Sequence, residues 1–168
     1  MGNLRQIDHA ALDLNAFQAI GKDWMLITAE REGRANTMTA SWGGIGHMWN
    51  KNVAFTVIRP QRYTKEFVDA VDTFSLSFIR GDRKVLSYLG TVSGRDEDKI
   101  GKSGLTLAHA DGTPYFEEAH TVLICKKLFS QPYLEESFLY KELYETWYPE
   151  KDYHTLYISE VIQVLTTD

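Results

Sequence analysis

Ala35-Asn36-Thr37-Met38-Thr39-Ala40-Ser41-Trp42-Gly43-Gly44 is the stretch on which the organisation of this chain depends, and Arg59-Pro60-Gln61-Arg62-Tyr63-Thr64 follows it after one further strand-like segment. The first stretch combines small and hydroxylated side chains with glycines and an aromatic ring. Such a backbone suits the lining of a flat, hydrogen-bonding ring. The second stretch places two arginines just ahead of a helix start, a combination that suits a phosphate.

The segments around these stretches predict strands. Trp24 to Thr28 and Ala35 to Ser41 form a predicted hairpin around the polar turn at residues 30–34. Val53 to Ile58 is apolar and β-branched, which fits a strand in a closed or well-covered sheet, and Pro60 ends it. Thr64 is a candidate N-cap for a helix that runs through Val71.

The rest of the chain continues in short strands punctuated by turns. Further strands are predicted over residues 74–79, 105–107, 115–116, 121–129 and 155–165, and helices over residues 82–89 and 134–147. Residues 1–23 carry a short helical pattern and are predicted to lead into the first strand without forming part of a site. No repeat or linker divides the chain. We therefore expect a single domain over residues 1–168 that is mainly β with peripheral helices, α+β overall, and closer to a barrel than to a doubly wound sheet.

Gly43, Gly44 and Gly46 predict an irregular backbone that could approach a ligand closely. Taken alone, the three glycines are better explained as a simple glycine-rich turn. No third glycine completes a dinucleotide-binding fingerprint, and no phosphate-loop lysine follows, so the two common nucleotide motifs are absent.

Composition narrows the classes of partner. The 168 residues carry a net charge of -5, which argues against a nucleic-acid or anionic-membrane surface. No apolar run has the length of a signal peptide or of a membrane span, so we expect a cytoplasmic protein. The single cysteine, Cys125, fits a buried strand position, and no histidine pair has metal-ligand spacing.

Two readings stay open at the candidate site. Arg59 and Arg62 fit a phosphate, but they could equally pair with surface acids such as Glu66 or Asp69. Trp42 could be a core residue, although its place between Ser41 and two glycines also fits a position beside a bound ring.

These two stretches, together with Ser93-Gly94-Arg95-Asp96-Glu97-Asp98-Lys99 and Tyr153-His154-Thr155-Leu156-Tyr157-Ile158-Ser159-Glu160-Val161, resemble the flavin reductase-like family over most of the chain. The resemblance implies an FMN-binding split β-barrel of Greek-key type. It also implies a homodimer in which each FMN site is completed at the interface between subunits.

The resemblance assigns roles to particular residues. The segment matching Met38, Thr39, Ala40, Ser41 and Trp42 lines the flavin ring, and that matching Arg59, Arg62, Tyr63 and Thr64 serves the phosphate, with Tyr63 beside the ribityl chain or ring. Ser93 and Gly94 match an element that approaches the flavin. Lys99 lies nearby in the family pattern, where a cation stabilises the anionic reduced ring. His154 matches a histidine that faces the flavin and the nicotinamide, while Ser159 stands where the family commonly has glycine.

The function implied is that of an NAD(P)H-dependent flavin reductase, in which hydride passes from NAD(P)H to FMN and a partner protein or oxygenase takes the reduced flavin or its electrons. Two alternatives share the same fold. One is a flavoredoxin-like electron carrier that keeps its FMN. The other is a flavin-binding dimer without turnover.

Overall fold

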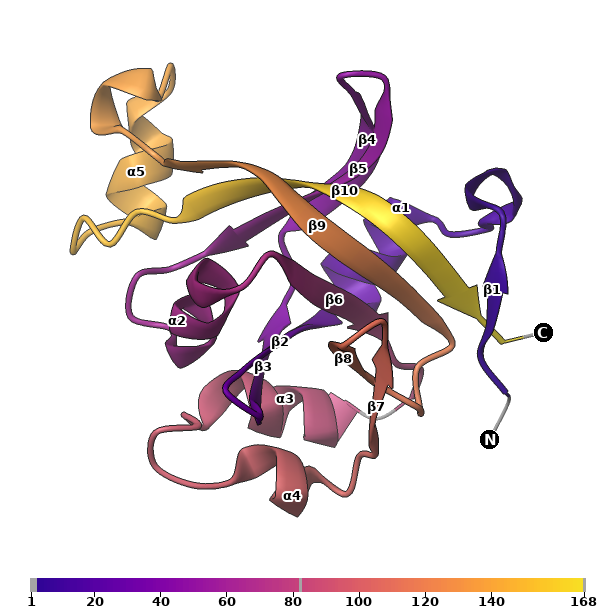
Figure 1. Cartoon of the computed structure of the whole chain (residues 1–168). Coiled ribbons are helices and arrows are strands. Elements are labelled where there is room, and N and C mark those ends of the chain that lie inside the picture. Colours follow the sequence, from indigo (N-terminus) through magenta and orange to yellow (C-terminus); the bar gives the residue numbers. More distant parts are fainter. Residues whose placement is uncertain (1–2, 82, 168) are drawn as a thin grey trace.

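The computed structural model describes residues 3–81 and 83–167, whose main feature is one antiparallel sheet (Figure 1). Its strands pair in the order β3-β2-β6-β9-β10-β5-β4, and β1 pairs separately with β10. Their bounds are β1 Arg5–Ile7, β2 Met25–Arg31, β3 Arg34–Ala40, β4 Gly43–Met48, β5 Lys51–Ile58, β6 Thr73–Phe78, β9 Thr121–Pro132 and β10 Thr155–Thr166. A second, two-stranded sheet contains β7 Leu107–Ala110 and β8 Thr113–Phe116.

The β2–β3 hairpin is confirmed, with Met25 opposite Ala40 and Arg31 opposite Arg34. Glu32 and Gly33 form its two-residue turn, and both have positive φ angles, 51° and 73°. Such a turn matches the right-handed twist of the strands that it joins. The hairpin delivers β3 to one end of the strand order, while β4 stands at the other end. Only Ser41 and Trp42 lie between β3 and β4 in the sequence. We call the junction between these two strands the seam, and the predicted ring-lining segment runs across it.

The glycines after Trp42 differ from the prediction, because they belong to a regular strand. β4 pairs with β5 from Gly43 opposite Thr56 to Met48 opposite Lys51. Gly43 itself requires glycine, since its φ is 148° and a Cβ there would collide with the carbonyl oxygen of Phe55. The glycines thus allow close strand pairing at the start of β4, in place of an irregular turn.

Helical segments cover the outside of the sheet. They are η1 His9–Ala11, α1 Ala16–Gln18, the π-helical turn η2 Ala19–Asp23, α2 Tyr63–Ala70, α3 Arg83–Thr91, α4 Lys99–Ser103, η3 Glu135–Ser137 and α5 Lys141–Trp147. The predicted N-cap at Thr64 is wrong. The N-cap is Arg62, and the buried Thr64 hydroxyl instead accepts a 2.8 Å hydrogen bond from the Asn36 amide.

Gly90 lies inside α3, which continues to Thr91, past the helix end predicted at residue 89. A Cβ at Gly90 would stand 3.0 Å from the Cβ of Thr39. The glycine therefore lets α3 pack directly against β3, and the Thr39 hydroxyl donates a hydrogen bond to the carbonyl of Leu86. This contact fixes the position of α3 beside the seam.

Two apolar clusters hold the fold together. The larger lies between the strands and α2 and includes Met25, Phe67, Phe74 and Tyr157. The smaller joins α3 to β2, β9 and the β7–β8 hairpin through residues such as Leu86 and Phe116. None of the helices in the described residues is long and apolar enough to cross a membrane.

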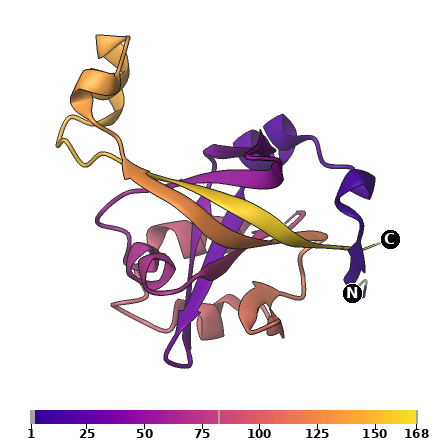
Figure 2. The same cartoon turned by 45° about the horizontal axis from the view of Figure 1, so that its top comes forward.

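β9 and β10 reach past the body of the molecule and carry α5 at their far end (Figures 1 and 2). We call residues 133–153 the arm. The single helix predicted over residues 134–147 is replaced there by η3 and the shorter α5. The arm has its own aromatic cluster, in which Phe138 packs against Tyr144, Tyr148 and Tyr153 with ring centroids 5.8–5.9 Å apart. Phe138 and its tyrosine partners therefore pack within a folded excursion, while Leu139 and Leu143 stay exposed.

Candidate functional site

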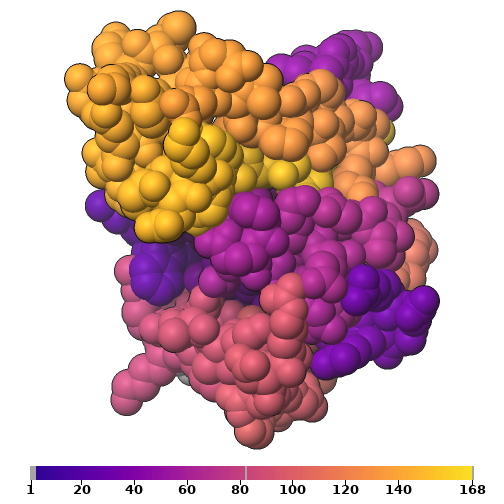
Figure 3. All heavy atoms as spheres, turned by 90° about the vertical axis from the view of Figure 1, so that its left-hand side faces the viewer, coloured from indigo at the N-terminus to yellow at the C-terminus, as the bar shows by residue number. Residues whose placement is uncertain are grey.

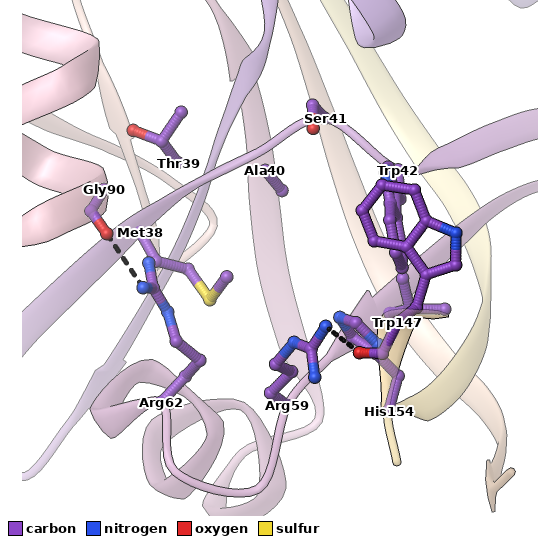
Figure 4. Close-up of a pocket in the computed structure, with 11 residues that line it drawn as sticks. Met38, Thr39, Ala40, Ser41, Trp42, Arg59, Arg62, Gly90, Trp147 and His154 are labelled. Carbon is purple, nitrogen blue, oxygen red and sulfur yellow. Dashed lines mark hydrogen bonds between the residues drawn. The ribbon is translucent and has the colours of Figure 1, made fainter. Parts of the chain in front are cut away.

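A cavity of about 460 Å³ lies between the seam, α3 and the base of the arm. In Figure 3 the yellow and orange C-terminal segment overhangs a hollow above the pink helices, and Figure 4 shows the side chains within it. The residues that line the cavity are Met38, Thr39, Ala40, Ser41, Trp42, Val57, Arg59, Arg62, Gly90, Trp147 and His154. Eight residues singled out from the sequence thus meet in one cavity, from three separate parts of the chain.

Arg62 places a positive charge on one wall of the cavity. Its Nη1 donates a 2.8 Å hydrogen bond to the carbonyl of Gly90 at the end of α3 (Figure 4). Burial lowers the pKa of Arg62 from its ordinary value, but an arginine stays charged at neutral pH. The contact with Gly90 uses one of five guanidinium donors, so Arg62 keeps donors for an anionic ligand.

Arg59 lines the same cavity, but it also holds the arm. Its Nη1 lies 2.7 Å from Oδ2 of Asp152, its Nη2 donates to the carbonyl of Trp147 at 2.9 Å, and its guanidinium lies 4.9 Å from the ring centre of Tyr148. Hydrogen bonds from Gln61 and Arg59 lower the pKa of Asp152. The acid that pairs with Arg59 is thus on the arm, and not one of the α2 acids considered from the sequence.

His154 closes the opposite side of the cavity as a neutral imidazole. It is buried, its Nδ1 lies 2.7 Å from the Tyr148 hydroxyl, and its ring centre lies 5.1 Å from that of Trp42. Burial first, and the charge of Arg59 second, lower the pKa of His154 to about 4. Within the described residues, Nε2 has no hydrogen-bond partner. The imidazole can therefore offer Nε2 to a ligand without changing charge near neutral pH.

Tyr63, Thr64, Ser93 and Gly94 lie outside the lining of this cavity. The guanidinium carbons of Arg34 and Arg95 lie 5.8 and 4.5 Å from the centre of the Tyr63 ring. A Cβ at Gly94 would collide with the Asn36 amide oxygen and approach the Tyr63 ring to 3.3 Å. Gly94 lines a neighbouring hollow of about 430 Å³, while the Ser93 hydroxyl accepts a 3.2 Å bond from the backbone of Arg95.

Lys99 also lies outside the cavity, at the end of α3. Its ammonium group is buried and donates 2.8 Å hydrogen bonds to the carbonyls of Leu89 and Val92. Burial and the nearby charge of Arg62 lower its pKa to about 8. These contacts give Lys99 a structural role, because a cation at the C-terminal end of a helix satisfies carbonyls that lack intrahelical partners.

We expect Lys99→Met to destabilise the fold by about 1–3 kcal/mol, because two buried carbonyls lose their donor. Urea unfolding followed by circular dichroism measures this loss. Lys102→Met is the matched control, since Lys102 is exposed and its charge pairs with Glu97 on the surface. A reduction potential of bound flavin that shifts in Lys99→Met, with stability unchanged, would instead support the electrostatic role that the sequence resemblance suggests.

Comparison with known proteins identifies the family. The sequence model of the flavin reductase like domain matches residues 17–168. The chain belongs to the flavin reductase-like family. None of the curated proteins matches the chain.

Solved structures of flavin reductase-like proteins share the fold. An FMN-binding domain of a flavin reductases-like enzyme from Shewanella baltica OS155 superposes with a TM-score of 0.71 at 19% identity, covering 99% of this chain and 78% of that one. An FMN-binding protein from Thermus thermophilus with bound p-hydroxybenzaldehyde gives 0.68 at 22% identity, with 98% and 82% covered. The styrene monooxygenase flavin reductase of Pseudomonas putida S12 gives 0.63 at 16%, with 87% and 79% covered. The predicted mainly β split barrel with peripheral helices is confirmed.

Ser159, which stands where the flavin reductase-like family commonly has glycine, faces the barrel interior. It shares a face of β10 with the core residues Tyr157 and Val161, and it is fully buried opposite Ala54. Its hydroxyl and that of Thr56 have no hydrogen-bond partner within the described residues. Ser159 therefore does not narrow the cavity.

Several residues of this cavity were missed in the sequence. Val57 and Gly90 read as ordinary strand and helix-end residues, and Trp147 as part of an amphipathic helix. Their place depends on how α3 and the arm fold back on the seam, which local patterns do not report. Among residues 3–81 and 83–167, no three His, Cys, Asp or Glu side chains come together as metal ligands.

Proposed function

We propose that this protein binds FMN in the cavity at the seam and acts as an NAD(P)H-dependent flavin reductase. The observation that supports this most strongly is the convergence of Arg62, the Thr39–Trp42 backbone and the neutral His154 on one cavity. The likeness to a flavin reductase and to FMN-binding proteins supports the same proposal. We further propose that the reduced flavin or its electrons pass to a partner protein or oxygenase in the cytoplasm.

The chain's donors fit FMN. The cavity volume of about 460 Å³ is within the range of small-molecule sites, about 300–1,000 Å³. Arg62 supplies charged donors for the phosphate, while the backbone and hydroxyl groups of residues 39–42 suit the hydrogen-bonding edge of the ring. When bound, FMN supplies the two-electron chemistry that no side chain of the cavity can perform.

The protein's part is to bind, orient and exclude water. Trp42 and Val57 present apolar surface to a ring, and Met38 is nearly buried on the floor of the cavity. His154 is held by Tyr148, so its imidazole keeps one orientation and leaves Nε2 to position a carbonyl or amide group of the nicotinamide. A fixed polar group of this kind contributes by holding reactants at near-attack distance.

Trp147 favours the second candidate function, a flavoredoxin-like electron carrier. Its ring lines the cavity and meets Trp42 edge-on, with centroids 5.1 Å apart, although half of its surface is exposed. A direct reductase needs an open ring face for the nicotinamide, whereas a carrier does not. The same cavity would also serve a flavin-binding dimer without turnover.

We also propose a homodimer that completes the FMN site. β9, β10 and the β4–β5 turn carry four exposed apolar residues, Trp49, Leu128, Phe129 and Ile162, each at least 39% exposed, which we call the apolar surface. Trp49 and Phe129 lie side by side there, with ring centroids 6.2 Å apart. The arm adds the exposed Leu134, Leu139, Tyr140, Leu143 and Trp147. An apolar patch of this extent is typical of an interface.

We expect Phe129→Glu to convert the dimer into a monomer, because it places a charge next to Trp49 among these exposed apolar residues. Light scattering measures the mass of both forms. Phe17→Glu is the matched control, since Phe17 is 92% exposed on α1 and is not one of the residues of the apolar surface. A wild-type monomer that still holds FMN tightly would refute the dimer proposal.

The cofactor assignment is tested by titrating the purified chain with FMN and with riboflavin in a calorimeter. We expect FMN to bind more tightly, because Arg62 contributes only to the ligand that carries a phosphate. Failure to bind either flavin would reject the proposed function.

A further inference from the structure

Tyr148 is not among the residues that line the cavity at the seam, but its hydroxyl contacts one that is. The side chain is buried, and its oxygen lies 2.7 Å from Nδ1 of His154. Among the described residues the hydroxyl has no other hydrogen-bond partner. The direction of this one hydrogen bond therefore decides which ring nitrogen of His154 carries the proton.

The two possible directions differ in what they leave unpaired. If Nδ1–H of His154 donated to Tyr148, the buried hydroxyl hydrogen would have no acceptor, which is costly. If Tyr148 donates, Nδ1 accepts and no hydrogen at this contact is left over. Both groups have the charge state that this second arrangement needs, because burial raises the pKa of Tyr148 to about 12 and lowers that of His154 to about 4.

The ring of Tyr148 is held from several sides, so its hydroxyl has a defined place. The guanidinium carbon of Arg59, just after β5, lies 4.9 Å from the ring centre. Within the arm, the ring packs against Tyr153 and Phe138 with centroids 5.1 and 5.9 Å apart. The arm therefore sets the position of the group that contacts His154.

We propose that Tyr148 is a positioning residue, which donates its hydroxyl proton to Nδ1 of His154 and so fixes the tautomer with the proton on Nε2. His154 then presents a donor, and the ligand group that it meets is a hydrogen-bond acceptor. The tautomer follows from the chain alone. The identity of the acceptor rests on the proposed function: it is the carboxamide oxygen of the nicotinamide, and not the carboxamide N–H group.

The tautomer is tested by long-range ¹H–¹⁵N NMR of the ligand-free full chain labelled in histidine. The signals of His154 are identified by their loss in His154→Ala. We expect a proton on Nε2 and none on Nδ1. A proton on Nδ1 would overturn the inference. The measurement needs no flavin, so its outcome is independent of the proposed function.

Tyr148→Phe keeps the ring and removes the hydroxyl, and an NMR pH titration of the variant reads the role of Tyr148. A hydroxyl that donates to Nδ1 stabilises the neutral imidazole, so its loss should raise the pKa of His154. A hydroxyl that accepts from Nδ1–H stabilises the charged imidazole more, so its loss should lower this pKa. A lower or unchanged pKa in Tyr148→Phe would therefore contradict the proposal.

Tyr153→Phe is the matched control, because Tyr153 lies on the same arm and its hydroxyl donates to Glu135. It should leave the pKa of His154 in place. The charged groups that act on the imidazole, Arg59 and Asp152, are present in both variants.

The effect on the ligand is tested by stopped-flow reduction of the FMN-loaded protein with NADH. We expect Tyr148→Phe to slow reduction about 2- to 10-fold, as for the loss of one hydrogen bond, with FMN affinity unchanged. In the His154→Ala background the same substitution should have no further effect, because Tyr148 acts through His154. Additive losses would show that Tyr148 acts only by supporting the arm, and would overturn its positioning role. If NADH and NADPH both fail to reduce the bound flavin, the proposed function is rejected, and the NMR result still decides the tautomer.

Discussion

His154→Ala is expected to slow the reduction of bound FMN by NADH or NADPH about 10- to 1000-fold, while FMN affinity stays nearly constant. The physical reason is positioning: the imidazole is buried and neutral, lines the cavity, and is tied to Tyr148 through Nδ1, which leaves Nε2 without a partner within the described residues. Because burial keeps the pKa of His154 near 4, the imidazole should remain neutral and the effect should be the same at pH 6 and pH 8. Stopped-flow absorbance at both pH values measures it.

His109→Ala is the matched control, because His109 is exposed on β7 and pairs with Glu30, outside the cavity. An equal loss of FMN affinity and reduction rate in His154→Ala would show that the histidine holds the cofactor and does not orient the nicotinamide. A rate that follows an ionisation near pH 6.5 would contradict the neutral imidazole.

Arg62→Ala is expected to weaken FMN binding by a factor of ten or more and to affect riboflavin much less. A hydrogen bond to a charged group contributes about 1.5–3 kcal/mol, and 1.4 kcal/mol corresponds to a factor of ten. Arg62→Lys keeps the charge but loses the planar fork of donors, so its FMN affinity should lie between those of the unmutated protein and Arg62→Ala. Calorimetric titration of each variant with both flavins measures the difference.

Arg31→Ala serves as the control, since Arg31 lies on β2 and pairs with Glu66 away from the cavity. Equal weakening of FMN and riboflavin by Arg62→Ala would show that the variant perturbs the Gly90 contact and the cavity shape. The phosphate assignment would then fail.

The strands of this fold were accessible from sequence, because alternating apolar residues and turn chemistry are local signals. The β2–β3 hairpin and β5 follow from them directly. Gly43 was misread because the need for glycine there comes from the close approach of Phe55, which lies on the neighbouring strand. Thr64 was misread because its hydroxyl partner, Asn36, is 28 residues away in sequence.

The residues of the candidate site also fall into those that a local motif reveals and those that long-range packing places. Residues 38–42 are adjacent in sequence, so one motif finds them all. Trp147 reaches the cavity only because the arm folds back, and Arg59 holds the arm through Asp152 and the Trp147 carbonyl. Lys99 lies close to Gly94 in sequence, yet burial at the end of α3 sets its contacts. Long-range packing of this kind leaves no local signature.

The central claim, direct reduction at the seam cavity, is tested by mixing the FMN-loaded protein anaerobically with NADH or NADPH and following the visible absorbance of the bound flavin. We predict that at least one nucleotide bleaches the bound flavin in a single-turnover phase. If neither nucleotide bleaches it while a chemical reductant does, the reductase proposal is contradicted and the electron carrier or flavin-binding dimer takes its place.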